Sequence, residues 1–134
     1  ADTNLDQVLD QDFDMVILPG GLPGATHLDE DARIHSLLGR QAERARWSAA
    51  ICAAPKVLAS AGLLDGHRAT SYPGAIRAAD FPSVRLVEDS VVTDGRVVTS
   101  RGPGTAMDFA LKLIEILVGR DVRVTVESAL MRPA

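Results

Sequence analysis

The stretch WSAAICAAP, residues 47–55, indicates the fold class of this chain. Its first five residues form a short, mostly apolar run, which favours a buried strand. Cys52 follows directly, and residues 53–61 are expected to form a helix with Pro55 in its first turn and Gly62 at its end. A strand that leads through a tight turn into a helix is the repeating unit of an α/β domain.

The segment before this stretch repeats the pattern. Residues 13–18 read FDMVIL, a nearly continuous apolar run that is typical of a strand buried on both faces of a parallel sheet. Pro19, Gly20 and Gly21 end this run. The acids of residues 29–31 then suit the positive end of a helix dipole. The helix that follows is expected to bury apolar residues at helical spacing: Ile34, Leu37, Leu38, Ala42 and Ala45.

The second half of the chain adds strands and a long helix. Asp94-Gly95 is the expected two-residue turn of a hairpin. Thr105 and Asp108 resemble a capping box, and the helix after them is expected to stop at Gly119. The other expected elements are strands at residues 68–71, 84–87, 91–93 and 97–99, a short helix or loop at 73–80, a Gly/Pro turn at 100–104, an apolar helical stripe at 109–118 and a weaker helix at 122–131.

Length and composition fit one globular domain. The chain has 134 residues, of which 46% are hydrophobic and 24% charged, and its net charge is −4. No dense basic cluster predicts a specific nucleic-acid partner, and no run reaches the roughly 18 apolar residues that a membrane span needs. One cysteine and an N-terminus without signal-peptide character favour a reducing, cytoplasmic location. We therefore expect a single domain over residues 1–134, with helices on both faces of a mostly parallel sheet.

Cys52 lies where parallel α/β sheets place their functional sites, outside the carboxyl end of a strand. Unpaired N–H groups at the start of a helix stabilise a thiolate and can hold an oxyanion. Gly20 and Gly21 suit the opposing wall, because glycine lets a backbone N–H approach a ligand closely. The alternative is that Cys52 is a small buried apolar residue without chemistry. No metal-site spacing is found among the histidines, which are interpreted as surface residues: His27, His35 and His67.

Three stretches resemble a known protein family. They are VILPGG (residues 16–21), AAICAAP (residues 49–55) and TSRGPGTAMDFAL (residues 99–111). Together they are similar to the ThiJ/PfpI superfamily, and within it to the branch of the Parkinsonism-associated protein deglycase and bacterial YajL. The resemblance covers residues 13–131. It implies an α/β fold of the flavodoxin-like type, a three-layer sandwich with a mostly parallel sheet, and a homodimer.

The resemblance also implies roles for individual residues. Cys52 matches the nucleophile of the family. Gly21 and Ala53 match positions whose N–H groups face the cysteine sulfur, and Gly20 lies beside them. Arg101 matches an arginine at the edge of the site, near the dimer interface.

The function implied by the resemblance leaves three alternatives. The leading one is an enzyme that converts reactive dicarbonyls, with methylglyoxal or early glycation adducts on proteins as substrates. The second is an oxidative-stress sensor and chaperone in which Cys52 is oxidised to a sulfenate or sulfinate. The third, a cysteine hydrolase or peptidase, ranks lowest, because Tyr72 stands where some members of the family have a histidine. Tyr72 is expected to donate a hydrogen bond or to line the site, and no metal or organic cofactor is implied.

The resemblance is incomplete at the N-terminus. The family begins with a strand–helix–strand unit that carries a glutamate beside the cysteine. Such a unit takes at least about 30 residues, whereas twelve precede Phe13 here, so we expect the chain to lack it. The native protein is therefore expected to be longer, or cleaved before Ala1 with the missing segment as a separate peptide partner. The remaining glutamates are interpreted as solvated charges: Glu30, Glu43, Glu88, Glu115 and Glu127.

Overall fold

The fold is built on a four-stranded sheet. The computed structural model describes residues 13–19 and 29–129. The strand order of its main sheet is β1-β2-β6-β5, in which β1, β2 and β6 are parallel and β5 is antiparallel to β6. These strands are β1 (Met15–Leu18), β2 (Trp47–Ile51), β5 (Val91–Asp94) and β6 (Val97–Ser100). The expectation of an α/β domain with a mostly parallel sheet is confirmed.

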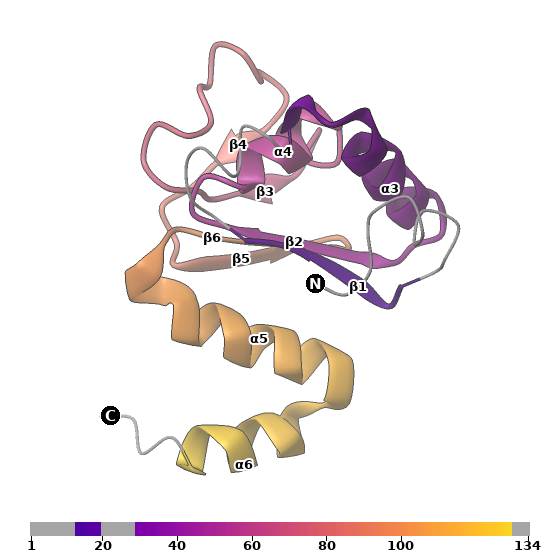
Figure 1. Ribbon diagram of the computed structural model, residues 1–134. Coiled ribbons are helices and arrows are strands. Elements are labelled where there is room, and N and C mark those ends of the chain that lie inside the picture. The colour runs from indigo at the N-terminus through magenta and orange to yellow at the C-terminus, as the bar shows by residue number, and fades with distance from the viewer. Residues whose placement is uncertain (1–12, 20–28, 130–134) are drawn as a thin grey trace.

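Helices lie on both faces of this sheet (Figure 1). On one face lie α3 (Ala32–Glu43) and α4 (Pro55–Ser60), and on the other lies α5 (Ala106–Val118). The last helix, α6 (Arg120–Ala129), packs on the side of α5 that faces away from the sheet. Gly119 ends α5 as expected, with a φ of 98° that favours glycine. No helix within the described ranges is long and apolar enough to cross a membrane.

Side chains alternate between the two faces of the strands and so build two separate cores. Ala50 of β2 belongs to the core under α3 and α4, where Leu38 and Leu58 are fully buried. Ala49, one residue earlier, belongs to the core under α5, together with Phe109. Because both faces of the central strands are covered, their sequences are nearly continuous apolar runs.

The segments that follow β2 are shorter than expected. Helix α4 begins only at Pro55, because the residues before it form a turn closed by a hydrogen bond from the Ala54 N–H to the Ile51 carbonyl (3.1 Å). Residues 73–80 form turns without a regular helix. The two remaining strands form a small parallel pair, β3 (Arg68–Ala69) and β4 (Arg85–Leu86).

The turn between β5 and β6 lies one residue later than expected. Asp94 pairs with Val97 in the ladder and therefore belongs to the strand. The Asp94 carboxylate accepts a hydrogen bond from the backbone N–H of Arg68 at 2.8 Å, which ties the hairpin to β3. Gly95 begins the turn with a φ of 62°, and a Cβ on it would lie 3.1 Å from Cε1 of His67. The conformation therefore favours glycine at this position, and a Cβ would also need the His67 ring to shift by a few tenths of an ångström.

Candidate active site around Cys52

Cys52 occupies the turn between β2 and α4 in a strained backbone conformation. Its φ is 63°, in the left-handed region that non-glycine residues rarely adopt. Two hydrogen bonds hold it there: the Cys52 N–H donates to the Ser100 carbonyl at 3.1 Å, and the Tyr72 N–H donates to the Cys52 carbonyl at 2.7 Å. Such a residue costs on the order of 1–3 kcal/mol and persists only where its surroundings enforce it. Strain of this kind is a reason to consider a functional role for the thiol.

Three segments that are distant in sequence meet at the Cys52 sulfur. A Cβ added to Gly102 would lie 3.9 Å from the Cys52 Sγ and 3.7 Å from Cδ2 of the Tyr72 ring. Cys52 is half-buried, whereas Tyr72 is 55% exposed. The Gly102 backbone therefore faces both the half-buried sulfur and the exposed tyrosine ring, at the carboxyl ends of β2 and β6.

Hydroxyl groups fix the loop that carries Gly102. Ser100 is fully buried, and its hydroxyl donates to the Ser90 carbonyl at 2.7 Å. The Ser100 and Thr105 hydroxyls are also 2.7 Å apart, and the single Thr105 proton has two acceptors within reach, the Ser100 hydroxyl and the Gly102 carbonyl at 2.9 Å. Thr105 Oγ1 in turn accepts from the Gly102 N–H at 3.0 Å. The expected capping box with Asp108 is therefore wrong, since α5 receives no side-chain cap from Thr105.

The structure places only some of the other expected site residues beside Cys52. Ala53 follows Cys52 in the turn, and no acceptor from the described part of the chain lies on its N–H. Arg101 lies next to Gly102, but its guanidinium donates to the Glu88 carbonyl at 3.1 Å. Gly20 and Gly21 lie outside the described residues. The structure thus brings Cys52, Ala53, Tyr72 and the backbone of the 100–105 loop together.

Sequence reasoning missed three residues of this environment: Ser100, Gly102 and Thr105. All three belong to the stretch TSRGPGT, in which the sequence predicts a Gly/Pro turn and a helix cap and the family resemblance assigns a site role to Arg101 alone. The available signal is their position at and just after the carboxyl end of β6, which lies beside that of β2.

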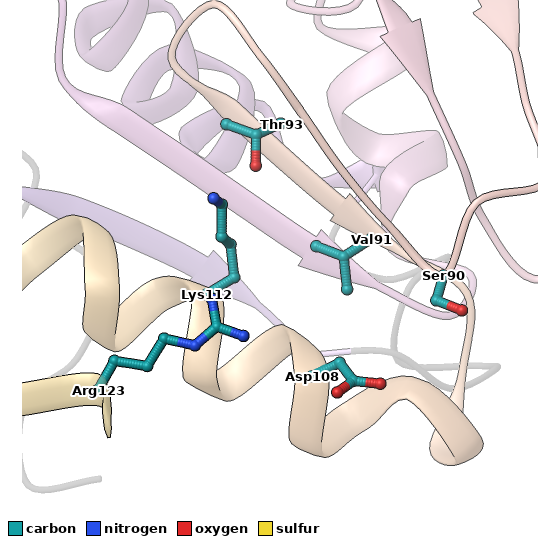
Figure 2. Close-up of a pocket in the computed structure, with 6 residues that line it drawn as sticks. All are labelled: Ser90, Val91, Thr93, Asp108, Lys112 and Arg123. Atoms are coloured by element: carbon teal, nitrogen blue, oxygen red, sulfur yellow. The ribbon is translucent and has the colours of Figure 1, made fainter. Parts of the chain in front are cut away.

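A separate cavity of about 490 Å³ lies between β5 and helices α5 and α6 (Figure 2). Its lining does not include Cys52, and Figure 2 shows the Lys112 side chain reaching from α5 toward β5 and the Arg123 side chain reaching from α6 toward α5. Arg123 and Lys112 bond the Glu115 carboxylate at 2.7 and 3.3 Å, and these bonds lower the pKa of Glu115. Glu115 is therefore an ion-paired group rather than the solvated charge that we expected. The cavity is lined by Ser90, Val91, Thr93, Asp108, Lys112 and Arg123.

The described histidines also have structural partners. His35 Nε2 lies 3.1 Å from the Asp29 carboxylate, and His67 Nδ1 lies 3.2 Å from that of Asp94. His27 lies outside the described residues. Within the described ranges, no three His, Cys, Asp or Glu side chains form a group that could hold a metal ion.

Known proteins provide an independent comparison. The DJ-1/PfpI family profile matches residues 1–116. The chain is 46% identical to Drosophila melanogaster Protein dj-1beta, over 90% of this chain and 64% of that protein. It is 42% identical to Arabidopsis thaliana Protein DJ-1 homolog A, over 98% of this chain and 34% of that protein. It is 39% identical to the Caenorhabditis elegans Glutathione-independent glyoxalase DJR-1.2, over 88% of this chain and 62% of that protein. The chain thus spans between about a third and just under two thirds of these relatives.

Solved structures agree with these relatives. The crystal structure of Drosophila melanogaster DJ-1beta superimposes with a TM-score of 0.91 at 42% identity, over 99% of this chain and 72% of that chain. The structure of oxidized Toxoplasma gondii DJ-1 gives a TM-score of 0.88 at 33% identity, over 100% of this chain and 72% of that chain. These likenesses confirm the flavodoxin-like fold. The resemblance to ThiJ/PfpI proteins is likewise confirmed, and the chain belongs to the DJ-1/PfpI family.

Proposed function

We propose that this chain carries the reactive cysteine of an enzyme that detoxifies small reactive dicarbonyls. The observation that carries the proposal is the strained Cys52 turn at the carboxyl end of the sheet. Similarity to a protein named as a glutathione-independent glyoxalase supports this substrate class. A role in carbonyl and oxidative stress is the broader form of the same proposal.

The first chemical step uses the thiolate of Cys52. Its sulfur attacks the aldehyde carbon of a 2-oxoaldehyde, a C–S bond forms, and the electron pair of the C=O bond moves to the oxygen. The Ala53 N–H, which has no acceptor among the described residues, is available to that oxyanion. Protonation of the oxygen completes a hemithioacetal.

The second step moves a proton from the former aldehyde carbon to the neighbouring carbon and the hydroxyl proton to the neighbouring oxygen, which gives a thioester. Water then attacks this thioester, so the C–S bond breaks, a 2-hydroxy acid leaves and the Cys52 thiol is restored. This transfer needs an acid–base group. The family resemblance assigns that role to a glutamate in the N-terminal strand–helix–strand unit. We therefore infer that full turnover needs this unit, in the same polypeptide or as a second peptide.

Substitution of Cys52 tests the enzyme proposal. In protein that includes this N-terminal unit, Cys52→Ser should abolish both the covalent methylglyoxal adduct seen by intact mass and lactate formation, while circular dichroism stays unchanged. Ser83→Ala is the matched control, because it removes only an exposed hydrogen bond to Asp65 (2.9 Å). Lactate formation by Cys52→Ser at the unsubstituted rate would show that the thiol is not the nucleophile.

A second proposal, an oxidation sensor with chaperone activity, uses the same thiol. Cys52 is the only cysteine of the sequence and is half-buried beside the Ala53 N–H. Each peroxide transfers one oxygen to the sulfur as its O–O bond breaks and water leaves, so two peroxides give a sulfinate. Mild peroxide should add two oxygens to Cys52 and none to Cys52→Ala. An oxidation product confined to methionine would contradict this reading.

The assembly of the protein is also a proposal. We infer a cytoplasmic homodimer from the family resemblance, with the dicarbonyl or a glycated protein as substrate. Light scattering of the purified chain measures its molar mass directly. A monomer at all concentrations would contradict the dimer.

A further inference from the structure

The backbone of Gly102 does not require glycine. Its φ and ψ are 172° and −164°, an extended conformation that any residue adopts. Gly95 and Gly119 differ, because their φ values of 62° and 98° lie in the left-handed region. The absence of a side chain at Gly102 therefore needs another explanation.

The space around Gly102 supplies that explanation. A Cβ there would lie 3.7 Å from the Tyr72 ring and 3.9 Å from the Cys52 sulfur. Both are ordinary van der Waals distances, so an alanine fits the folded chain. It would, however, fill the wedge between the ring and the sulfur. Gly104, in the same loop, has no atom within 4 Å of its added Cβ and serves as a natural comparison.

Gly102 is also held firmly in this position. Its N–H donates to the Thr105 hydroxyl at 3.0 Å, and its carbonyl accepts from the Thr105 N–H at 2.9 Å. Thr105 is anchored to the buried Ser100 hydroxyl at 2.7 Å. On the other side, the Cys52 backbone is bonded to the Ser100 carbonyl. The wedge therefore cannot widen easily when a larger group enters it.

We propose that Gly102 is a specificity-determining residue, whose missing side chain leaves room for the carbon that bonds to the Cys52 sulfur. This inference rests on the proposed reaction of Cys52 with a carbon electrophile. It narrows the substrate class to aldehydes that carry a small group beside the carbonyl, because the Tyr72 ring bounds the other side of the wedge.

Alkylation of Cys52 tests this inference without any need for turnover. The rates with iodoacetamide, a small reagent, and N-phenylmaleimide, a bulky one, are read by intact mass at one pH. Gly102→Ala should lower the bulky-to-small rate ratio by about tenfold, the effect of a methyl-sized clash in a packed site. Gly104→Ala should leave the ratio unchanged. An equal ratio in both variants would overturn the inference.

Removal of the Tyr72 ring, on the other side of the wedge, keeps the inference testable if Gly102→Ala does not fold. Tyr72→Ala should raise the bulky-to-small ratio severalfold, and an unchanged ratio would overturn the proposed wedge. These results are separate from the enzyme proposal. If protein that includes the N-terminal unit shows no methylglyoxal turnover but a normal alkylation pattern, the enzyme proposal is refuted and the wedge is retained.

Discussion

Ser100→Ala removes the hydroxyl that fixes the loop beside Cys52. The Ser100 hydroxyl makes two hydrogen bonds of 2.7 Å, to the Ser90 carbonyl and to the Thr105 hydroxyl. Each such bond contributes about 0.5–1.5 kcal/mol net to stability. Neither partner is stranded by the change. Ser90 is exposed, so its carbonyl can bind water, and the Thr105 hydroxyl can donate to the Gly102 carbonyl at 2.9 Å.

The expected loss is therefore about 1–2 kcal/mol of the free energy of unfolding, below the roughly 3 kcal/mol of two bonds lost with stranded partners. Urea unfolding measures it, as a lower midpoint with an unchanged slope. Ser83→Ala is the control, because its hydrogen bond is exposed and its loss should change stability by less than about 0.5 kcal/mol. If the two variants lose the same stability, the Ser100 network does not hold the loop.

Other positions give sharp expectations. Cys52→Gly should be at least as stable toward urea as Cys52→Ala. Glycine adopts the left-handed conformation without strain, and this gain offsets the roughly 0.5–1 kcal/mol that its greater freedom in the unfolded chain costs. A glycine variant that is clearly less stable than the alanine variant would refute the strain. Gly95→Ala should lose more than about 1 kcal/mol in the same assay, because φ is positive and the new Cβ meets His67; a loss no greater than that of Gly104→Ala would contradict this. The hydrogen bond from Arg123, followed by that from Lys112, lowers the pKa of Glu115 in the folded chain. The ionised Glu115 carboxylate therefore stabilises the fold above the unfolded pKa, and this stabilisation is lost as the pH falls through the folded pKa. The stability difference between the unsubstituted chain and Glu115→Gln should therefore shrink on acidification, and a difference constant with pH would contradict the ion pairs.

The sheet and its longer helices could be predicted because their signal is local. The run at residues 47–51 matches β2, and the helical stripe of apolar residues matches α5. The start of α4 and the role of Thr105 could not be predicted in the same way. A hydroxyl can form hydrogen bonds with several partners. The Thr105 hydroxyl bonds that of Ser100, which in turn donates to the Ser90 carbonyl, and only the folded hairpin brings these residues together.

In the candidate site, too, features with a local sequence signal could be predicted and those formed by distant segments could not. Cys52 could be singled out because strand, cysteine and helix are contiguous in sequence. The proximity of Gly102 to the Tyr72 ring could not be predicted, because 29 residues lie between them and nothing in their spacing pairs the two. Gly102 also carries a misleading signal: glycine beside proline favours a turn, whereas its extended backbone shows that space, not conformation, is what glycine supplies.

The proposed enzyme and the proposed sensor use the same thiolate but reactants of different size, and this difference offers a way to tell the two functions apart. The Cys52 N–H bonds the Ser100 carbonyl one step beyond the last pair of the β2–β6 ladder, so the sheet itself positions the sulfur in either case. The two functions differ in what must reach that sulfur. A carbon electrophile brings its substituents into the wedge beside Gly102, whereas peroxide adds single oxygen atoms that need much less room. A methyl group at Gly102 should therefore slow carbon electrophiles and spare oxidation to the sulfinate. If Gly102→Ala slows both reactions equally, the wedge controls thiolate reactivity rather than size, and enzyme and sensor cannot be separated at this position.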